Sequence, residues 1–576
     1  MNRKQRRAAE KQNPPGPAIA PADPLRRLLA EAAQAERAGK PDAAVRAYRR
    51  LLALKPDHAE AHNNLGRVLH AQGKLRDASQ HFARSLMLMP QVFDQYAGIC
   101  ATLISLLPPL GAAMRTAAQA WPERRSIDAL FGPGEFDTVA GDPLLLCVLQ
   151  STPVRDVAFE RLLTSLRGGL LADALAGKAA ADGVLAFACA LAKQSFINEY
   201  IFATTPEEDA QAVHLIKVLD TGADIAPFAL AAAAMYMPLS VLPAADSLLD
   251  RAWPPAIDGL LTQHLRDRAR ERELRAAMPR LSAIEDGVSQ RVRQQYEENP
   301  YPRWVHVAGA VDPAPIDQYI RGLFPTTPFT PTGESGPLDV LVAGCGTGWH
   351  AIGVAQKFAG ARVLAVDLSL ASLAYAERST PDGLKPRISY AQADILKLGS
   401  LERRFDMIDA SGVLHHMADP SLGWRTLVGL LRRGGLMHLG LYSELGRQDV
   451  VAARAFIGER GYDATPADIR RCRQDLLQTP MRSLTRFTDF FTTSECRDLL
   501  FHVQENRVTI PAIKDFLAAN GLRFLGFEFD TPTQQEYRAL FSGSGWSPTD
   551  LDRWHALETA RPQLFSSMYH FWVQKD

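Results

Sequence analysis

Short apolar runs alternate with amphipathic stretches in the second half of the chain, and this alternation predicts an α/β fold. Residues 338–343 are mostly apolar, and residues 362–366 form a second apolar run that ends at Asp367. Between them, residues 349–358 have a helix-compatible composition. Strand, glycine turn, helix and strand together form a βαβ unit of the kind that binds nucleotides. Two later runs, 522–529 and 568–574, alternate with period two and predict a closing pair of strands.

The first half of the chain has helical periodicity and a repeat. Gly39, Ala44, Tyr48 and Pro56 recur 34 residues later as Gly73, Ala78, Phe82 and Pro90. This spacing resembles the tetratricopeptide repeat, a helix-turn-helix unit. Because stable arrays usually need three repeats, we expect residues 91–121 to supply a degenerate unit or a capping helix. The resemblance implies a peptide-binding groove, with simple packing on the next domain as the alternative.

These patterns predict several domains. Residues 225–245 carry no charge but include three prolines, so we expect a buried helix there and no membrane span. The expected parts are a disordered basic and proline-rich tail (1–24), tetratricopeptide-like repeats (25–124), an α-helical domain (125–285), a linker or strap (286–335), and an α/β domain (336–576) with an insertion at about 444–510.

The glycine turn decides which ligand the βαβ unit predicts. Its sequence, residues 344–348, is Gly-Cys-Gly-Thr-Gly, and Trp349 follows. Glycine adopts unusual backbone angles and lets a ligand approach the main chain, and amides at a helix start favour an anionic group. Dinucleotide sites use GxGxxG instead, so this spacing favours a ligand with an amino-acid end.

The turn resembles motif I of the class I S-adenosylmethionine-dependent methyltransferases. Residues 388–395, 405–420 and 431–439 resemble the family's third-strand, fourth-strand and fifth-strand motifs, in the family's order. The resemblance implies helical repeats and a helical bundle followed by a doubly wound, seven-stranded Rossmann-like sheet with an antiparallel edge. It also implies S-adenosylmethionine as cofactor. The expected cofactor-binding residues are Gly344, Cys345, Gly346, Thr347, Gly348, Asp367, Leu368, Asp394, Ile395, Ser411 and Val413.

One position departs from that family. Many members carry an acid two residues before the first glycine, where it helps to hold the amino group of the ligand. Val342 occupies this position here, so backbone carbonyls or another residue would have to hold that group.

The candidate catalytic residues are His415, His416 and Tyr301. Methyl transfer needs a base only when the nucleophile must lose a proton, and the two histidines follow the fourth strand, beside the expected methyl group. The segment Tyr296–Trp304, YEENPYPRW, is similar to segments in bacterial proteins that join repeats to this catalytic domain. Tyr301 and Trp304 are expected either to line the substrate or cofactor cleft or to hold a linker in place by aromatic contacts. Weaker candidates are Tyr442, Glu444, His502 and Glu505.

Composition excludes some classes of protein. The formal net charge is zero and the isoelectric point is about 7.2, which gives no dominant attraction for nucleic acid or acidic membranes. The six cysteines form no CxxC pair, so we expect no metal site and no disulfide framework, and a reducing cytoplasm.

Three functions compete at this point. The first is a methyltransferase acting on a protein recruited by the repeats or on a small molecule. The second is a noncatalytic scaffold in which the repeats act and the methyltransferase fold is a remnant. The third, a nicotinamide dehydrogenase, is disfavoured by the GxGxG spacing and by the lack of a substrate-site acid/base constellation.

Overall fold

The computed structural model describes residues 24–89, 102–221, 225–307, 312–333, 336–529, 533, 535–537 and 547–576. They form two compact units, one reaching residue 89 and including 102–107, and one from residue 108 onward. The expected disordered tail, apart from Pro24, lies outside the described residues, as do residues 91–101 of the expected third repeat unit. The domain boundaries expected from the sequence stay predictions.

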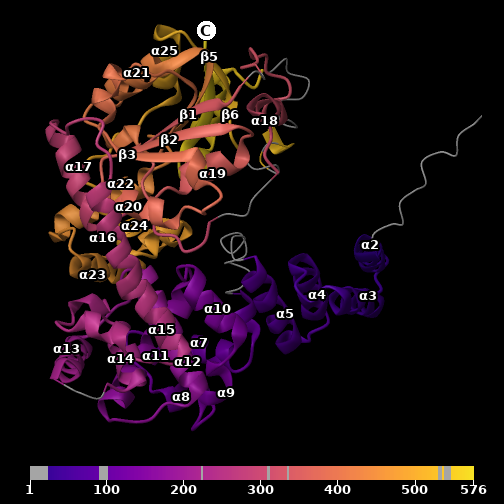
Figure 1. Cartoon of the computed structure of the whole chain (residues 1–576), viewed down its shortest axis with the longest axis vertical. Helices are drawn as coiled ribbons and strands as arrows, with labels where there is room; N and C mark the ends of the chain where they lie inside the picture. Colours follow the sequence, from indigo (N-terminus) through magenta and orange to yellow (C-terminus); the bar gives the residue numbers. More distant parts are fainter. Residues whose placement is uncertain are drawn as a thin grey trace, which may run out of the picture. The chain divides into compact units, whose positions relative to one another are not determined.

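The first unit consists of two helix pairs, as the 34-residue period predicts (Figure 1). Gly39 and Gly73 make the turn within each pair with φ of +65° and +74°. Ala44 is fully buried, and Tyr48 donates a hydrogen bond to Glu36 Oε1 at 2.6 Å. The tetratricopeptide-like architecture is confirmed for α2 (Pro24–Arg37), α3 (Pro41–Leu54), α4 (Ala59–Ala71) and α5 (Leu75–Leu88).

A helical region opens the second unit. Its central helix α12 (Asp182–Ile197) is mostly apolar and largely buried. It packs against α9 (Phe136–Ala140), α10 (Pro143–Ser151), α14 (Pro227–Ala234) and α15 (Pro255–Leu261). The uncharged segment 225–245 contributes the eight-residue α14, which is buried, and a short 3-10 helix, Leu239–Val241. Among the described residues, every helix falls short of the length and apolarity needed to cross a bilayer. The remaining helices of the region are α7 (Leu110–Ala120), α8 (Ile127–Phe131), α11 (Val157–Leu175), α13 (Pro206–Thr221) and α16 (Asp267–Ala277).

A seven-stranded sheet follows, with strand order β3-β2-β1-β4-β5-β7-β6. The first five strands are parallel, and β7 lies antiparallel between β5 and β6, which confirms the expected fold class. The strands are β1 (Leu338–Ala343), β2 (Ala361–Asp367), β3 (Ile388–Gln392), β4 (Phe405–Ser411), β5 (Leu431–Leu441), β6 (Leu522–Phe527) and β7 (Tyr569–Lys575).

Helices cover both faces of the sheet and enclose two apolar cores. Helices α18 (Ile316–Leu323), α19 (Trp349–Lys357) and α20 (Leu370–Ser379) cover one face. Helices α21 (Pro420–Leu430), α25 (Ile510–Ala519) and α27 (Leu551–Ala560) cover the other. The strand order reverses between β1 and β4, and ligands of open α/β sheets bind at such a switch point.

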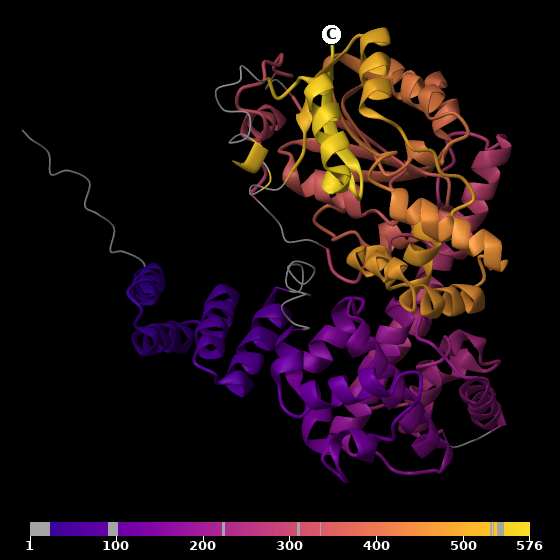
Figure 2. The ribbon, with the colours of Figure 1, turned by 180° about the vertical axis from the view of Figure 1, so that it is seen from behind.

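Between β5 and β6 the chain inserts α22 (Gln448–Arg460), α23 (Pro466–Leu477) and α24 (Thr493–Phe501), which Figure 2 shows in orange. This insertion contacts the helical region through buried polar groups. Arg473 on α23 donates to both carboxylate oxygens of Glu160 on α11, at 3.1 and 2.9 Å. Ser494 N on α24 donates to Glu199 Oε2 at 2.5 Å.

The outer edge of β3 is covered by a segment that follows α16. Leu281 N donates to Gln392 O and Gln392 N donates to Pro279 O, both at 2.8 Å. Ser282 Oγ also accepts a hydrogen bond from Asp394 N at 2.8 Å. Residues 279–282 therefore provide hydrogen-bond partners for backbone groups of the edge strand β3 and of Asp394, which would otherwise be exposed.

Candidate functional site

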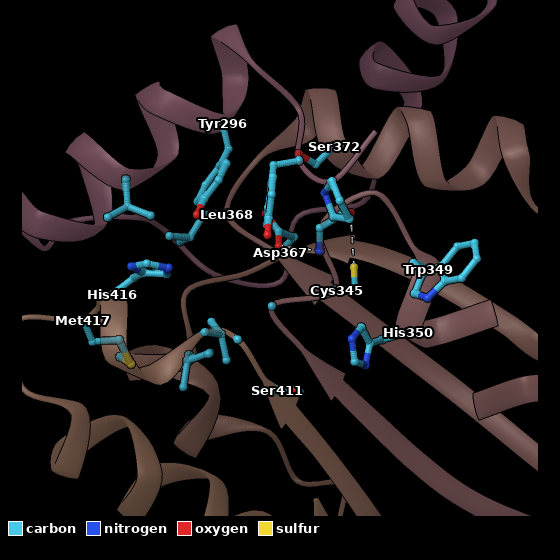
Figure 3. A pocket seen from close by; sticks show the side chains of 18 of the residues that line it. Tyr296, Cys345, Trp349, His350, Asp367, Leu368, Ser372, Ser411, His416 and Met417 are labelled. Atoms are coloured by element: carbon cyan, nitrogen blue, oxygen red, sulfur yellow. Dashed lines mark hydrogen bonds between the residues drawn. The ribbon is translucent and has the colours of Figure 1, made fainter. Parts of the chain in front are cut away.

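A cavity of about 240 Å³ lies at the carboxyl ends of β1 and β4, at the switch point (Figure 3). The turn after β1, the residues after β2 and β3, and the loop after β4 form its floor and sides. Helix α17 (Gly287–Glu298) and the strap residues Tyr301 and Pro302 add a further wall. Of the expected cofactor-binding residues, the cavity is lined by Gly344, Cys345, Gly346, Asp367, Leu368, Asp394, Ile395, Ser411 and Val413.

The glycine turn is shaped by the protein itself as well as by any ligand. Gly344, Gly346 and Gly348 have φ of +74°, +51° and +90°. A Cβ on Gly344 would lie 2.4 Å from Val413, and one on Gly348 would lie 2.7 Å from Ala376. The third glycine thus permits close packing of α20, and neither Thr347 nor Gly348 lines the cavity.

Two carboxylates face the cavity from the ends of neighbouring strands. Asp367 is held by two backbone donors at 2.8 Å, Gly346 N on Oδ2 and Ser369 N on Oδ1. Asp394 caps the following helical turn, because its Oδ1 accepts from Leu396 N at 3.0 Å. Asp394 Oδ2 is buried and has no hydrogen-bond partner among the described residues. A buried carboxylate oxygen without a donor indicates a place for a ligand N–H.

Burial raises the pKa of Asp367, which two backbone N–H donors partly offset. Its carboxylate is already used to hold the glycine turn in place, so it positions the turn and faces the cavity at once. Asp367 and Asp394 together fit the hydrogen-bonding pattern of an adenosyl ligand. The five amides of the glycine turn already donate to protein oxygens, Gly346 N to Asp367 and the other four to backbone carbonyls.

The strap meets the glycine turn through Thr347. Its hydroxyl donates to Pro302 O and accepts from Trp304 Nε1 at 3.1 Å. Trp304 O accepts from Tyr375 OH. Tyr301 lines the cavity, whereas Trp304 is buried behind the turn and does not. The two aromatic residues that were expected to act alike therefore occupy different places.

The two candidate catalytic histidines also separate. His416 lines the cavity, but His415 does not; its ring stacks on Tyr442 with ring centres 3.7 Å apart. Burial lowers the pKa of both rings, and that of His415 lies well below its ordinary value. Both imidazoles are therefore neutral at physiological pH.

His416, Asp498 and His502 gather their side-chain polar atoms within 4.8 Å of one another, a spacing that a metal ion would suit. The hydrogen bonds assign the protons, however. His416 Nδ1 donates to Gln504 O at 2.9 Å, whereas His502 Nδ1 accepts from Gln504 N at 3.0 Å. His502 Nε2 consequently carries a hydrogen, so it has no lone pair for a metal. Tyr296 OH donates to Asp498 Oδ1 at 2.5 Å, which completes a hydrogen-bonded cluster.

Several cavity residues were not found by sequence reasoning. Tyr296, Trp349, His350, Met568 and His570 line the cavity. Trp349 and His350 open α19 directly after the glycine turn, and their position in the motif was a usable signal. Met568 and His570 lie at the start of the last strand; the period-two pattern of residues 568–574 predicted that strand but not that these two side chains line the cavity.

Comparison with known proteins agrees with this architecture. Residues 340–435 match the family model of a methyltransferase domain, and residues 29–91 match that of the tetratricopeptide repeat. The uncharacterized protein syc1184_c of Synechococcus sp. is 31% identical over 291 residues, which cover 48% of this chain and 67% of that protein. Methyltransferase GfsG of Streptomyces halstedii is 31% identical over 160 residues, covering 26% of this chain and 57% of GfsG.

The solved structures that match part of this chain include two with bound S-adenosylhomocysteine (AdoHcy or SAH). PKMT2 from Rickettsia typhi in complex with AdoHcy is 16% identical, with a TM-score of 0.33, covering 48% of this chain and 55% of that chain. Magnesium protoporphyrin IX methyltransferase from Synechocystis with bound SAH is 13% identical, with a TM-score of 0.26, covering 55% and 97%.

Proposed function

We propose that this chain is an active methyltransferase. The premise is that the chain belongs to the class I S-adenosylmethionine-dependent methyltransferases and carries a tetratricopeptide-repeat region. The cofactor would bind in the cavity between β1 and β4, and it supplies an activated methyl group on sulfur. The observation that carries the proposal is the buried Oδ2 of Asp394, unpartnered among the described residues; Asp394 lines the cavity together with Asp367 and the glycine turn.

Each group at the cavity has a role in this proposal. Asp367 accepts from the ribose hydroxyls, and Asp394 Oδ2 accepts from the adenine amino group. Because the amides of the glycine turn already donate to protein oxygens, the positive end of the α19 dipole is what would favour the carboxylate of the amino-acid end. Val342 replaces the acid of many family members, so backbone carbonyls of the turn would hold the amino group.

The repeats support recruitment of a protein substrate, because such arrays bind peptides. A small-molecule acceptor is the alternative. The rival class, a noncatalytic scaffold with a remnant fold, is disfavoured by the intact glycine turn and by the two carboxylates at the cavity.

Calorimetric titration of the full-length protein with S-adenosylmethionine, S-adenosylhomocysteine and NAD tests the proposal. We expect both adenosyl ligands to bind and NAD to bind far more weakly, whereas preferred binding of NAD would overturn the assignment. Failure of all three ligands to bind would favour the scaffold.

Asp394→Asn sharpens this test, because asparagine keeps the Oδ1 cap on Leu396 N but turns an N–H donor toward the ligand. We expect the affinity for S-adenosylhomocysteine to fall by about tenfold to a hundredfold, the loss of a hydrogen bond to a charged group. S-inosylhomocysteine, which has a carbonyl in place of the amino group, should bind the variant better than the wild type. Asp382→Asn is the matched control, since that side chain is 94% exposed and pairs only with Lys385 among the described residues. Equal affinities for the Asp394 variant and the wild type would contradict the adenine assignment.

A further inference from the structure

A second cavity, of about 530 Å³, adjoins the cofactor cavity on the face of the sheet covered by α19. Trp349, His350 and His570 line both cavities, so these three side chains stand where the two meet. The remaining walls of the second cavity come from α19, β4, β5, β7 and the segment after β6. Nothing in the cofactor assignment uses this space.

Strand register places a polar row at this cavity. Asp409 on β4 pairs with His438 on β5, which pairs with Trp572 on β7. Because side chains two residues apart share a face, Met407 and Leu436 lie on the same face as Asp409 and His438, and both are fully buried in the core. The side chains on this face are therefore apolar in the middle of β4 and β5 and become polar, as Asp409 and His438, at the carboxyl ends of these strands, next to the cofactor cavity.

Asp409 lies between two imidazoles. His438 Nδ1 is 3.0 Å from Asp409 Oδ2, and His350 Nδ1 is 3.7 Å from Asp409 Oδ1. The His350 side chain is 44% exposed, in contrast to Asp409 at 6%. At 3.7 Å the Asp409 carboxylate is beyond hydrogen-bond length, but its charge favours the His350 tautomer with hydrogen on Nδ1, which leaves the Nε2 lone pair to accept a proton.

The charges around His350 favour its role as a proton acceptor. Burial lowers the pKa of His350, but the Asp409 carboxylate outweighs this and the net shift is upward. The other groups facing it are Glu528, Lys357, His438 and His570. Burial, reinforced by His438, lowers the pKa of His570 to about 4, so His570 stays neutral. An imidazole whose pKa lies above its ordinary value is a stronger base than a free histidine side chain, which suits proton removal.

We propose that the second cavity holds the methyl acceptor, an oxygen or nitrogen nucleophile that carries a proton, and that His350 Nε2 removes this proton while Asp409 positions the ring. This inference rests on the proposed function. The nucleophile's electron pair forms the new bond to the methyl carbon, and the carbon–sulfur bond breaks with its pair passing to sulfur. The proton moves to Nε2, and the resulting imidazolium is stabilised by Asp409.

The rival base, His416, lies on the opposite side of the cofactor cavity from His350 (Figure 3). His416 belongs to the Tyr296–Asp498–His502 cluster, and its Nε2 is 3.9 Å from Asp498. Burial lowers the pKa of His416, in contrast to the upward shift of His350. A base at His350 and a base at His416 would require the methyl group to leave toward opposite sides of the cofactor cavity, so an experiment can distinguish the two assignments.

Sinefungin tests this without knowledge of the acceptor, because an amine replaces the sulfonium methyl of the cofactor. The measurement is the ratio of the affinities for sinefungin and S-adenosylhomocysteine, obtained by calorimetry on the full-length protein from pH 6 to 9. In the wild type, the ratio should rise with pH, because protonated His350 repels the ammonium group and neutral His350 accepts its hydrogen bond. In His350→Gln, the ratio should fall by about tenfold at pH 8 and lose this pH dependence.

His416→Gln is the matched control, and we expect it to leave the ratio and its pH dependence unchanged. Asp409→Asn tests positioning: the midpoint of the pH dependence should move to lower pH, an effect that loss of stability alone does not produce. Thermal melting checks that each variant is folded. An unchanged ratio in His350→Gln, or a fall in His416→Gln instead, would overturn the inference while leaving the proposed function intact. Binding of neither ligand by the wild type would overturn both.

Discussion

The contact between Arg473 and Glu160 should account for much of the stability of the junction between the helical region and the insertion. The Arg473 side chain is fully buried and that of Glu160 is 5% exposed. Besides its two bonds to Glu160, the guanidinium donates from Nε to Phe490 O at 2.8 Å. Glu160→Gln would leave a buried, uncompensated positive charge, and breaking such a pair costs about 3–5 kcal/mol. We expect this loss in urea unfolding followed by circular dichroism and tryptophan fluorescence.

Two comparisons make this result interpretable. Replacing both partners with methionine should recover most of the loss, because well-packed apolar groups of similar volume can substitute for a buried ion pair. Arg471→Met on the same helix is the control: that side chain is 70% exposed and pairs with Asp468, so its loss should cost at most about 1 kcal/mol. If Glu160→Gln shifted stability no more than Arg471→Met, the junction would not depend on the pair. If the double methionine variant lost as much unfolding free energy as its two single substitutions, Glu160→Met and Arg473→Met, lose together, the desolvation argument would be refuted.

Four further changes test other features. Gly346→Ala should lower the melting temperature and weaken cofactor binding. A left-handed backbone costs a non-glycine residue about 1–2 kcal/mol, and the new Cβ would lie 2.6 Å from the carbonyl oxygen of Tyr301 in the strap. An unchanged melting curve would contradict this. Gly353→Ala should raise stability by about 0.5–1 kcal/mol, because no heavy atom of the described residues outside its own helix lies within 4 Å of the new Cβ. Trp304→Phe should lower the free energy of unfolding by about 0.5–1.5 kcal/mol through the lost hydrogen bond to Thr347, and the variant should keep the wild-type affinity for S-adenosylhomocysteine. A large loss of affinity would instead mean that the strap takes part in cofactor binding. Removing residues 1–90 should leave calorimetric cofactor affinity unchanged, because the cavity lies wholly within the second unit.

Much of the fold could be predicted because its signals are local. The apolar runs that became β1 and β2, the glycine turn between them and the terminal Asp367 are contiguous, so spacing alone indicates a βαβ unit. The period-two runs near the C-terminus likewise became β6 and β7. The 34-residue repeat was visible because each copy carries the same small and aromatic positions.

The site was predictable only where its residues follow a strand in sequence. Asp367 and Asp394 come directly after apolar runs, and both line the cavity. The His350–Asp409–His438 group draws on a helix and two strands, so it depends on register that no local pattern reveals. Tyr301 and Trp304 looked equivalent because the direction of a side chain in an irregular segment depends on its neighbours.

The segment 279–282 that pairs with Gln392 has a practical consequence for anyone who expresses the α/β part alone. An unpaired edge strand is a template for association with other chains. A fragment that begins at residue 336, where the sheet starts in sequence, would expose the edge of β3 and the backbone of Asp394 beside it. Such a fragment should aggregate, whereas one that begins before α16 should stay monomeric. The start of the smallest well-behaved fragment is therefore set by the protection of a sheet edge, and it lies about seventy residues upstream of the first strand.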